Sequence, residues 1–555
     1  MAIGATGIGF ASTDRVWSIP TDAPLNELAK ADERWSPRWV WWGRETSGRV
    51  AAGPVAVDRC WDVLAVHRLL SSDWRASPGK AWAWLHDLPT ESLPTMGQLG
   101  LLDAAVDEGD TDDPVRPDGH LRPEWTSGGW DRSADHLGRW ANVALKAVAL
   151  QRDRLAQLPD PSRAEATARA ESAAELLCAE MAHEGLPVNA QVALRLIGDA
   201  AGPRPTSEAD EIDIRAARDQ VVFAHLIPGQ KVNLRNPADV KSMFHQAGFD
   251  LPDTKAWRLA QLRDSSPLAD AFLAWRKAER IASTYGYAWF DDHVAGGRLR
   301  GDWASSDGAA GRMTASAGLH NLPATMRPMV EAGPDRVFVR ADLGQVEPRV
   351  LAAVSGDADL ADACKGDDLY QPIADRLGVS REIAKVAVLG AMYGATTGES
   401  AHALAGLKKN YPVAMGLLED AAEAGQAGSD VFTVGGRRIV MWTDPAAAGD
   451  IDRARSAAAS RGRYARNALV QGAAAELFKL WAITVRRRIR PLGASVVLCL
   501  HDELLVHCSA ANATDVANMV DGSLQEAAHY WMPDHASPVR FLADISQVRR
   551  WSEAK

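Results

Sequence analysis

The sequence predicts an α+β fold in which an antiparallel sheet is backed by helices. From Arg298 onward, short strand-like runs alternate with helical patterns. The clearest of them is Ser495–Cys508, where two apolar runs flank His501-Asp502-Glu503 and predict a tight β-hairpin with acids at its tip. Residues 159–180 and 259–291 show helical periodicity instead. The chain therefore combines long helices with a sheet made of neighbouring strands.

The bulk composition is that of a globular protein with several domains. Of 555 residues, 46% are hydrophobic and 24% are charged. No apolar run of about 18 residues is evident and the N-terminus lacks a signal-peptide pattern, so no membrane association is expected. Five cysteines without a CxxC pair predict a reducing, cytoplasmic location and disfavour structural zinc. The net charge of -11 argues mildly against nucleic-acid binding, although a basic cleft can lie on an acidic body.

A first candidate site follows a predicted buried strand at Val337–Val339. Asp342 falls at the end of this strand, where metal-binding groups are commonly displayed. Pro348 and Arg349 then open a helix, because proline is tolerated in a first helical turn. Together with Asp502 at the hairpin tip, Asp342 is a candidate metal ligand.

A second candidate site is the predicted helix SREIAKVAVLGAMYG, for which Ser380 is a suitable N-cap. Arg381, Lys385 and Leu389 are spaced at i, i+4 and i+8, and Tyr393 follows one turn later. They therefore share one helix face. Two cations and an aromatic ring on one face suit a triphosphate and a stacked base.

Each of these motifs also has a plainer interpretation. A single Asp at a strand end is often a turn or cap residue. Two cations on a helix are most simply a solvated face. For the arginine run at 486–490 the solvated face is the preferred interpretation. The order and spacing of the motifs carry more weight than any one of them.

Taken together, the motifs resemble those of family A DNA polymerases, from about Glu180 to Lys555. DLGQVEPR, which begins at Asp342, is similar to motif A, usually DYSQIELR. The pattern R-x3-K-x3-LG-x2-YG from Arg381 is similar to motif B, and HDE at 501–503 to motif C. Weaker similarities imply DNA contacts for Arg312, Asn321, Arg463, Asn467 and Gln471, and the resemblance also assigns His501 and Glu503 of motif C to DNA binding.

The resemblance implies a catalytic centre with two Mg²⁺ ions, for which Mn²⁺ can substitute. Asp342 and Asp502 would bridge the ions, and Leu343 would add its backbone carbonyl. Lys385 would also protonate the leaving pyrophosphate, and Glu347 would act as a steric gate against ribonucleotides. The implied dNTP contacts are Arg381, Lys385, Leu389, Tyr393, Glu347, Gln345 and Tyr370.

The implied architecture is a right-hand polymerase, with a thumb at 173–297, a palm at 298–365 and 446–555, and fingers at 366–445. Residues 1–172 are interpreted as a degenerate ribonuclease H-like 3′–5′ exonuclease domain. Its first strand lacks a D-x-E pair, and Asn142 stands where the last catalytic Asp is expected. The alternative is an unrelated packing module, since twelve of the twenty tryptophans lie between Trp17 and Trp140.

The implied function is template-directed DNA synthesis by a monomer that binds primer-template DNA and dNTPs at the nucleoid, without proofreading. Two rivals remain. A single-subunit RNA polymerase is disfavoured by Glu347 and Glu503, and a non-catalytic DNA-binding relic is disfavoured because the motif residues occur together. The departures from the family pattern concern substrate recognition and leave fidelity open; they are Leu343, Gly344, Leu389, Tyr370 and His320.

Overall fold

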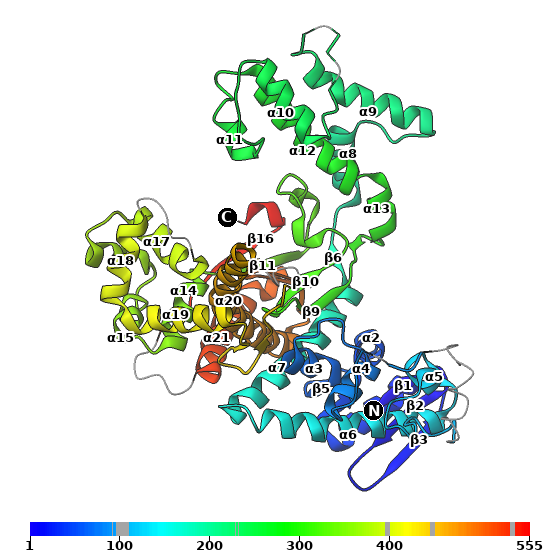
Figure 1. Ribbon diagram of the computed structural model, residues 1–555. Helices are drawn as coiled ribbons and strands as arrows, with labels where there is room; N and C mark the ends of the chain where they lie inside the picture. The colour runs from blue at the N-terminus through cyan, green and yellow to red at the C-terminus, as the bar shows by residue number, and fades with distance from the viewer. Residues whose placement is uncertain are drawn as a thin grey trace. The chain divides into compact units, whose positions relative to one another are not determined.

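The computed structural model describes residues 1–91, 93–95, 110–227, 229–230, 232–394, 400–444, 450–532 and 539–554. The chain forms two compact units (Figure 1). The first unit comprises Met1–Glu184, Asp302–Ala315 and Asp335–Gln547. The second comprises Gly185–Gly301, Ser316–Pro334 and Val548–Lys555. Each unit has its own hydrophobic core.

The first unit is built around a four-stranded antiparallel sheet in the order β14-β15-β11-β16. The strands are β14 (Ser495–Leu500), β15 (Glu503–Ser509), β11 (Arg336–Leu343) and β16 (Ala543–Val548). The predicted hairpin is present as β14 and β15, and the predicted buried strand is β11. Residues such as Phe338, Val339 and Leu505 are fully buried, because helices α20 (Ile451–Ile489) and α21 (Ala513–Trp531) pack against the sheet.

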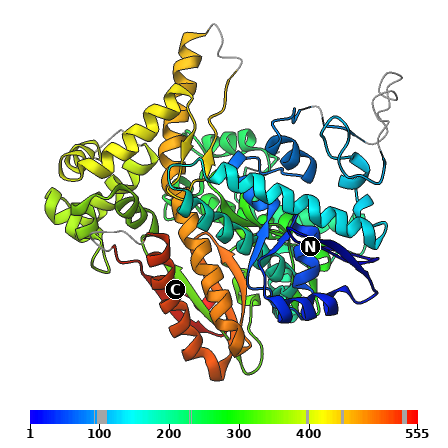
Figure 2. The same cartoon turned by 90° about the horizontal axis from the view of Figure 1, so that it is seen from below.

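Helix α20 is the longest element and lies alongside α21 (Figure 2). The region Ile451–Leu492 is long and apolar enough to cross a membrane by composition, an Ala-rich stretch that the sequence expectation missed. Of its most apolar window, 83% is buried inside the protein, which is the behaviour of a core helix. The solvated face predicted for the arginine run is wrong for Arg486, which is buried and pairs with Glu180 at 2.5 Å.

Among the described residues, six helices lie between β11 and α20 in this unit, the first two in the predicted palm segment and the other four in the predicted fingers. They are α14 (Val346–Ser355), α15 (Ala358–Ala363), α16 (Tyr370–Leu377), α17 (Arg381–Tyr393), α18 (Ser400–Asn410) and α19 (Pro412–Ala427). A small hairpin of β12 (Val431–Phe432) and β13 (Arg438–Ile439) follows. The predicted boundary between 445 and 446 lies outside the described residues.

The N-terminal part of the first unit has an antiparallel sheet of β1 (Ala2–Gly4), β2 (Gly7–Ala11) and β3 (Val16–Pro20). Strands β4 (Trp39–Trp41) and β5 (Cys60–Asp62) pair in parallel. The accompanying helices are α1 (Pro24–Trp35), α2 (Arg44–Ala51), α3 (Val63–Ser71), α4 (Pro78–Leu85), α5 (Pro123–Thr126) and α6 (Ala134–Leu155). A Cβ at Gly9 would lie 2.1 Å from the Leu137 backbone, so glycine lets α6 approach the sheet closely.

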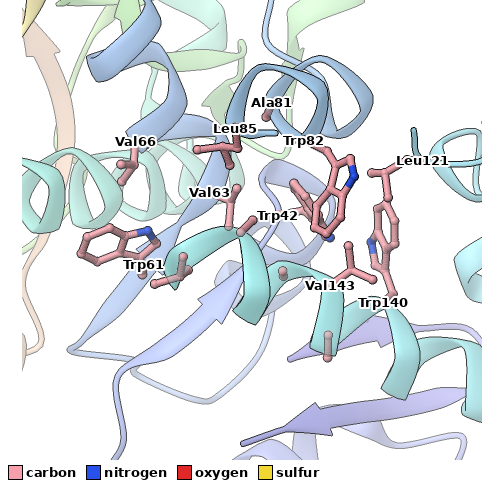
Figure 3. Packing of buried hydrophobic residues seen from close by; sticks show 14 of the residues in the cluster. Trp42, Trp61, Val63, Val66, Ala81, Trp82, Leu85, Leu121, Trp140 and Val143 are labelled. Atoms are coloured by element: carbon pink, nitrogen blue, oxygen red, sulfur yellow. The ribbon is translucent and has the colours of Figure 1, made fainter. Parts of the chain in front are cut away.

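Most tryptophans of this part lie in its core, although Trp35 and Trp74 are exposed. Trp42, Trp61, Trp82 and Trp140 are almost fully buried and pack among aliphatic side chains (Figure 3). The rings of Trp42 and Trp140 lie 5.1 Å apart. Burial of such large rings contributes strongly to the stability of a small core. The high tryptophan content is thereby explained by packing.

Helix α7 (Pro161–Glu184) joins this part to the central sheet of the first unit. It runs without a break through the predicted boundary between 172 and 173. It packs against α2, α3 and β5 on the N-terminal side and also against α20 and β9 (Trp303–Asp307). Strand β9 forms a hairpin with β10 (Arg312–Ala315).

The second unit is mainly helical. Its helices are α8 (Ala190–Ala201), α9 (Glu208–Phe223), α10 (Pro237–Gln246), α11 (Ala256–Ala260), α12 (Pro267–Thr284) and α13 (Tyr287–His293). A short sheet of β6 (Leu186–Pro187), β8 (Arg298–Leu299) and β7 (Val294–Ala295) lies at its base. The core includes Phe244, Phe272 and Trp275. The helical periodicity predicted over 259–291 is found here as α11, α12 and α13.

Candidate active site

Two strand ends bring the predicted catalytic acids together. Asp342, near the end of β11, is the register partner of Glu503, the first residue of β15. Asp502 lies in the two-residue turn between β14 and β15, next to His501, which has a φ of 56°. The backbone N–H of Leu343 donates to the carbonyl of Asp502 at 3.0 Å. The sheet register therefore fixes Asp342 beside Asp502.

Both acids hold their protons more tightly than free carboxylic acids. Burial, and then the negative charge of Asp502, raise the pKa of Asp342 to about 6. Burial also raises the pKa of Asp502. Burial of two adjacent carboxylates disfavours their charged forms, and a bound cation would offset that cost.

Arg340 supplies positive charge at this point, and the sequence interpretation missed it. Its guanidinium lies 2.7 Å from Asp342 and 3.1 Å from Glu503, with Asp544 at 3.5 Å. Arg340 and Asp342 are two residues apart on one strand, so their side chains share a face of the sheet. That alternation is the sequence signal by which Arg340 could have been found.

The acid pair fits the requirements of Mg²⁺. Hard carboxylate oxygens are the ligands that Mg²⁺ prefers, and this ion usually keeps waters and substrate oxygens in its shell. Throughout the described ranges, no group of three or more His, Cys, Asp or Glu side chains converges on one point. Asp342 and Asp502 would thus bind the ion as a pair, with the remaining positions open.

A cavity of about 320 Å³ lies beside the acids. It is lined by many of the residues predicted to contact substrates and by six unpredicted ones, Met313, Val346, Pro348, Ala474, Ala475 and Phe478. Most of Phe478 is buried, so its ring forms an apolar wall. The predicted site residues that line the cavity are Arg312, Leu343, Gln345, Glu347, Tyr370, Leu389, Tyr393, Gln471, His501 and Asp502.

The turn between β11 and α14 places Gln345 and Glu347 at the cavity. Gln345 caps α14 with a φ of 54°, a left-handed conformation that costs energy in a non-glycine residue. Its side-chain amide compensates by donating to Asp368 at 3.0 Å and accepting from the N–H of Leu369 at 3.0 Å. The turn is therefore stabilised by Asp368 and Leu369, the two residues that precede α16.

The face of α17 that was predicted to bind substrate is not buried in the protein. Its buried residues are Ala384, Ala387, Val388, Ala391 and Met392, which pack inside the fingers region. Arg381 and Leu389 are half-buried, and Lys385 and Tyr393 are exposed. Ser380 caps the helix by accepting from the N–H of Ile383. The apolar residues on the buried face thus leave the side chains predicted to bind substrate on the other face.

Arg381 is bound to Asp368, a residue that the sequence interpretation missed. Its Nε donates to Asp368 at 2.7 Å and one terminal nitrogen donates at 3.1 Å. This hydrogen bonding lowers the pKa of Asp368. The guanidinium also lies over the buried ring of Tyr370, 5.6 Å from its centre. Arg381 is therefore oriented before any anion binds.

Tyr393, Glu347 and Arg312 form a chain across the cavity. The Tyr393 hydroxyl donates to Glu347 at 2.8 Å, and Arg312 donates to the other Glu347 oxygen at 3.1 Å. Burial, and then the bond to Glu347, raise the pKa of Tyr393. The chain connects α17, α14 and β10, three elements from distant parts of the sequence.

The remaining predicted DNA contacts lie on α20 and in the second unit. Arg463, Asn467 and Gln471 are spaced at i, i+4 and i+8 on α20, and Gln471 reaches the cavity. Arg463 is exposed. Asn321 is exposed and belongs to the second unit, where its carbonyl accepts from Arg280 at 2.7 Å. Part of the predicted set therefore lies at the cavity, whereas Asn321 belongs to the second unit.

Comparison with known proteins agrees with this geometry. The model of DNA polymerase family A matches residues 211–553. DNA polymerase I of Chloroflexus aurantiacus is 31% identical over 294 residues, which cover 47% of this chain and 30% of the relative. A thermostable DNA polymerase I of Thermus thermophilus is 31% identical over 301 residues, which cover 48% of this chain and 34% of the relative. The chain thus spans about a third of the length of these relatives.

A solved structure has a similar fold. The POL domain of Pol1 from M. smegmatis, in complex with DNA primer-template and dNTP, superposes with a TM-score of 0.61. The match covers 89% of this chain and 82% of that one, at 22% sequence identity. The fold is therefore that of a polymerase domain, with mixed helix and sheet content. Because the family model matches more than half of its length, the chain belongs to DNA polymerase family A.

Proposed function

We propose that the protein is a template-directed DNA polymerase that adds dNTPs to a primer 3′-hydroxyl. The observation that carries this proposal is the pair Asp342 and Asp502, half-buried beside a cavity lined by Arg312, Glu347 and Tyr393. Membership of the family and the primer-template and dNTP held by the solved neighbour support it.

Asp342 and Asp502 would hold two Mg²⁺ ions, with the Leu343 carbonyl as a further oxygen ligand. When bound, these ions would activate the attacking hydroxyl and neutralise charge on the leaving group. Arg340 limits the repulsion between the acids, because it pairs with Asp342 and Glu503. Arg340 therefore lowers the electrostatic cost of holding these acids together before cations bind.

Arg381 and Lys385 would bind the triphosphate from the exposed face of α17. Such cations stabilise charge on transferring phosphoryl groups. Arg381 must exchange Asp368 for the incoming phosphates, whereas Lys385 is already exposed. Lys385 would also deliver a proton to pyrophosphate. Leu389 and Tyr393, further along the helix, would contact the sugar and base.

We assign residues 1–172 to a degenerate ribonuclease H-like exonuclease domain that lacks proofreading. The first strand pair carries no carboxylate, since β1 is AIG and β2 is GIGFA. Asn142 on α6 lacks the charge that a metal ligand there would need. The thumb, palm and fingers are proposed with the predicted boundaries, although α7 continues across the first of them.

The decisive experiment is primer extension with Mg²⁺ and four dNTPs. Wild-type protein is expected to extend the primer, while Asp342→Ala and Asp502→Ala lower the rate by about a thousandfold or more, since metal ions supply several kcal/mol of transition-state stabilisation. Primer-template affinity is measured in parallel and should persist. Extension near the wild-type rate by either variant would refute the assignment.

A further inference from the structure

A β-bulge lies directly beside Arg312 in the β9–β10 hairpin. Arg312 pairs with Asp307 and Thr314 pairs with Ala304, so Ser305 and Ser306 together oppose Met313. A bulge leaves backbone groups outside the ladder and redirects neighbouring side chains. Both serines are buried, so their polar groups need partners within the protein.

Those partners come from outside the hairpin and are charged. Glu175 of α7 accepts from the Ser305 N–H at 3.2 Å and from its hydroxyl at 2.6 Å. Lys479 of α20 donates to the Ser305 carbonyl at 3.2 Å, and Arg437 donates to the Ser306 hydroxyl at 3.1 Å. Every polar group of Ser305 is thus bonded to a buried ionic side chain.

Two carboxylates of α7 hold these charges in place. Glu171 pairs with both Arg437 and Lys479, and all three side chains are almost fully buried. Burial opposes the charge of Glu171, but these two cations outweigh it and lower its pKa. Glu175 is paired in turn with Arg68 of α3 at 2.8 Å. The network therefore runs from the N-terminal part of the unit to the hairpin.

The end of the hairpin is tied to the same network. Gly311, next to Arg312, has a φ of 68°, and a Cβ there would lie 2.3 Å from the Arg437 guanidinium. Arg437 therefore packs directly against the backbone that enters β10. A displacement of Arg437 or Ser305 would change the direction of Arg312, whose register partner Asp307 adjoins the bulge.

We propose that helix α7 acts as a buttress for polymerisation, with Glu175 and Glu171 as positioning residues that fix Arg312 through the bulge. This inference rests on the proposed function, in which Arg312 contacts the primer-template. The N-terminal part would contribute to DNA binding through Arg68, which pairs with Glu175. Glu175 acts through Ser305 and does not itself touch DNA.

The test compares Glu175→Ala with Arg312→Ala and with the double variant, using primer-template affinity at fixed salt. Loss of one such arginine contact weakens binding by about tenfold. We expect Glu175→Ala to weaken binding to a similar degree. The double variant should be no weaker than Arg312→Ala alone, because both changes remove the same contact. Glu175→Gln, which keeps an acceptor oxygen, should recover part of the affinity.

Glu180→Gln is the matched control. Glu180 also lies on α7 and pairs with buried Arg486, but its partners lie away from the hairpin. Hydrogen exchange over 303–315 is measured in all variants. Glu175→Ala should raise exchange in this segment, and Glu180→Gln should not, even where their melting temperatures fall equally.

The outcomes separate the two proposals. If Arg312→Ala leaves affinity unchanged, the DNA contact is wrong, and the exchange of 303–315 still decides whether Glu175 orders the hairpin. If Arg312→Ala weakens binding but Glu175→Ala does not, the buttress is overturned. It is also overturned if the losses in the double variant are fully additive, or if Glu180→Gln behaves like Glu175→Ala.

Discussion

The hydroxyl of Tyr393 donates to Glu347 at 2.8 Å, and this bond joins helix α17 to the start of α14. Arg312 binds the second oxygen of the same carboxylate at 3.1 Å. Glu347 is therefore fixed through both oxygens at the edge of the cavity. A carboxylate held so firmly cannot turn aside for a larger substrate, which makes it suitable as a selective barrier.

Glu347→Ala is expected to increase the use of ribonucleotides by about ten- to a hundredfold. A 2′-hydroxyl buried against Glu347 without a partner costs about 1–3 kcal/mol, and truncation removes this penalty. Tyr393→Phe removes only the tethering hydroxyl, so it should give a smaller gain. The measurement is the ratio of dNTP to rNTP incorporation efficiency, and an unchanged ratio in Glu347→Ala would count against the gate.

Leu389→Tyr is expected to narrow the preference for dNTPs over dideoxynucleotides. Leu389 lines the cavity one turn beyond Lys385 and offers neither a ring face nor a hydroxyl to replace a missing 3′-hydroxyl. Leu389→Met, which preserves size and apolarity, is the control. Should the ratio stay constant in an active Leu389→Tyr enzyme, the residue does not face the sugar.

The purified protein is expected to lack 3′–5′ exonuclease activity. The strands β1 and β2 carry no carboxylate, and Asn142 cannot supply an anionic ligand. End-labelled single-stranded DNA is incubated with Mg²⁺ or Mn²⁺ and its length is followed. The control is the Asp342→Ala, Asp502→Ala double variant, and shortening that survives in it would reveal an intact nuclease.

The free energy of unfolding is expected to decrease as the pH falls below about 6.5, in part because of His67. Burial lowers the pKa of this imidazole to about 4 in the folded protein. Between about pH 6.5 and 4 the unfolded chain therefore binds a proton that the folded chain does not, which favours unfolding. The difference amounts to about 2 kcal/mol at pH 5.

His67→Gln should remove that part of the pH dependence. Urea unfolding at pH 7 and pH 5 measures it, and His245→Gln serves as the control because that imidazole is exposed. The direction of the change tests the assignment: an increase in the free energy of unfolding on acidification that disappears in His67→Gln would contradict it.

The polymerase-like half of the chain was largely predictable because its signals are local. The hairpin around Asp502 follows from two apolar runs, and the face of α17 follows from a spacing of four residues. The strand before Asp342 was equally plain. Such patterns place a residue on an element, and the family resemblance then implied which elements meet.

The partners of these residues could not be predicted in the same way. Asp368 binds Arg381 across thirteen positions, and Glu175 binds Ser305 across 130. The spacing of neither pair indicates contact, because the contact depends on how separate elements pack. The burial of Arg486 was missed for the same reason, because Glu180 reaches it from α7. Long-range ion pairs inside a core require the tertiary structure.

The unbroken course of α7 bears on how the first unit melts. One of its carboxylates, Glu171, neutralises two buried cations, and removing one partner of a buried ion pair costs about 3–5 kcal/mol. The N-terminal region therefore cannot detach on heating while the sheet and α20 remain intact. We expect calorimetry to give one cooperative transition for both regions, with a van't Hoff enthalpy close to the calorimetric enthalpy of the whole unit.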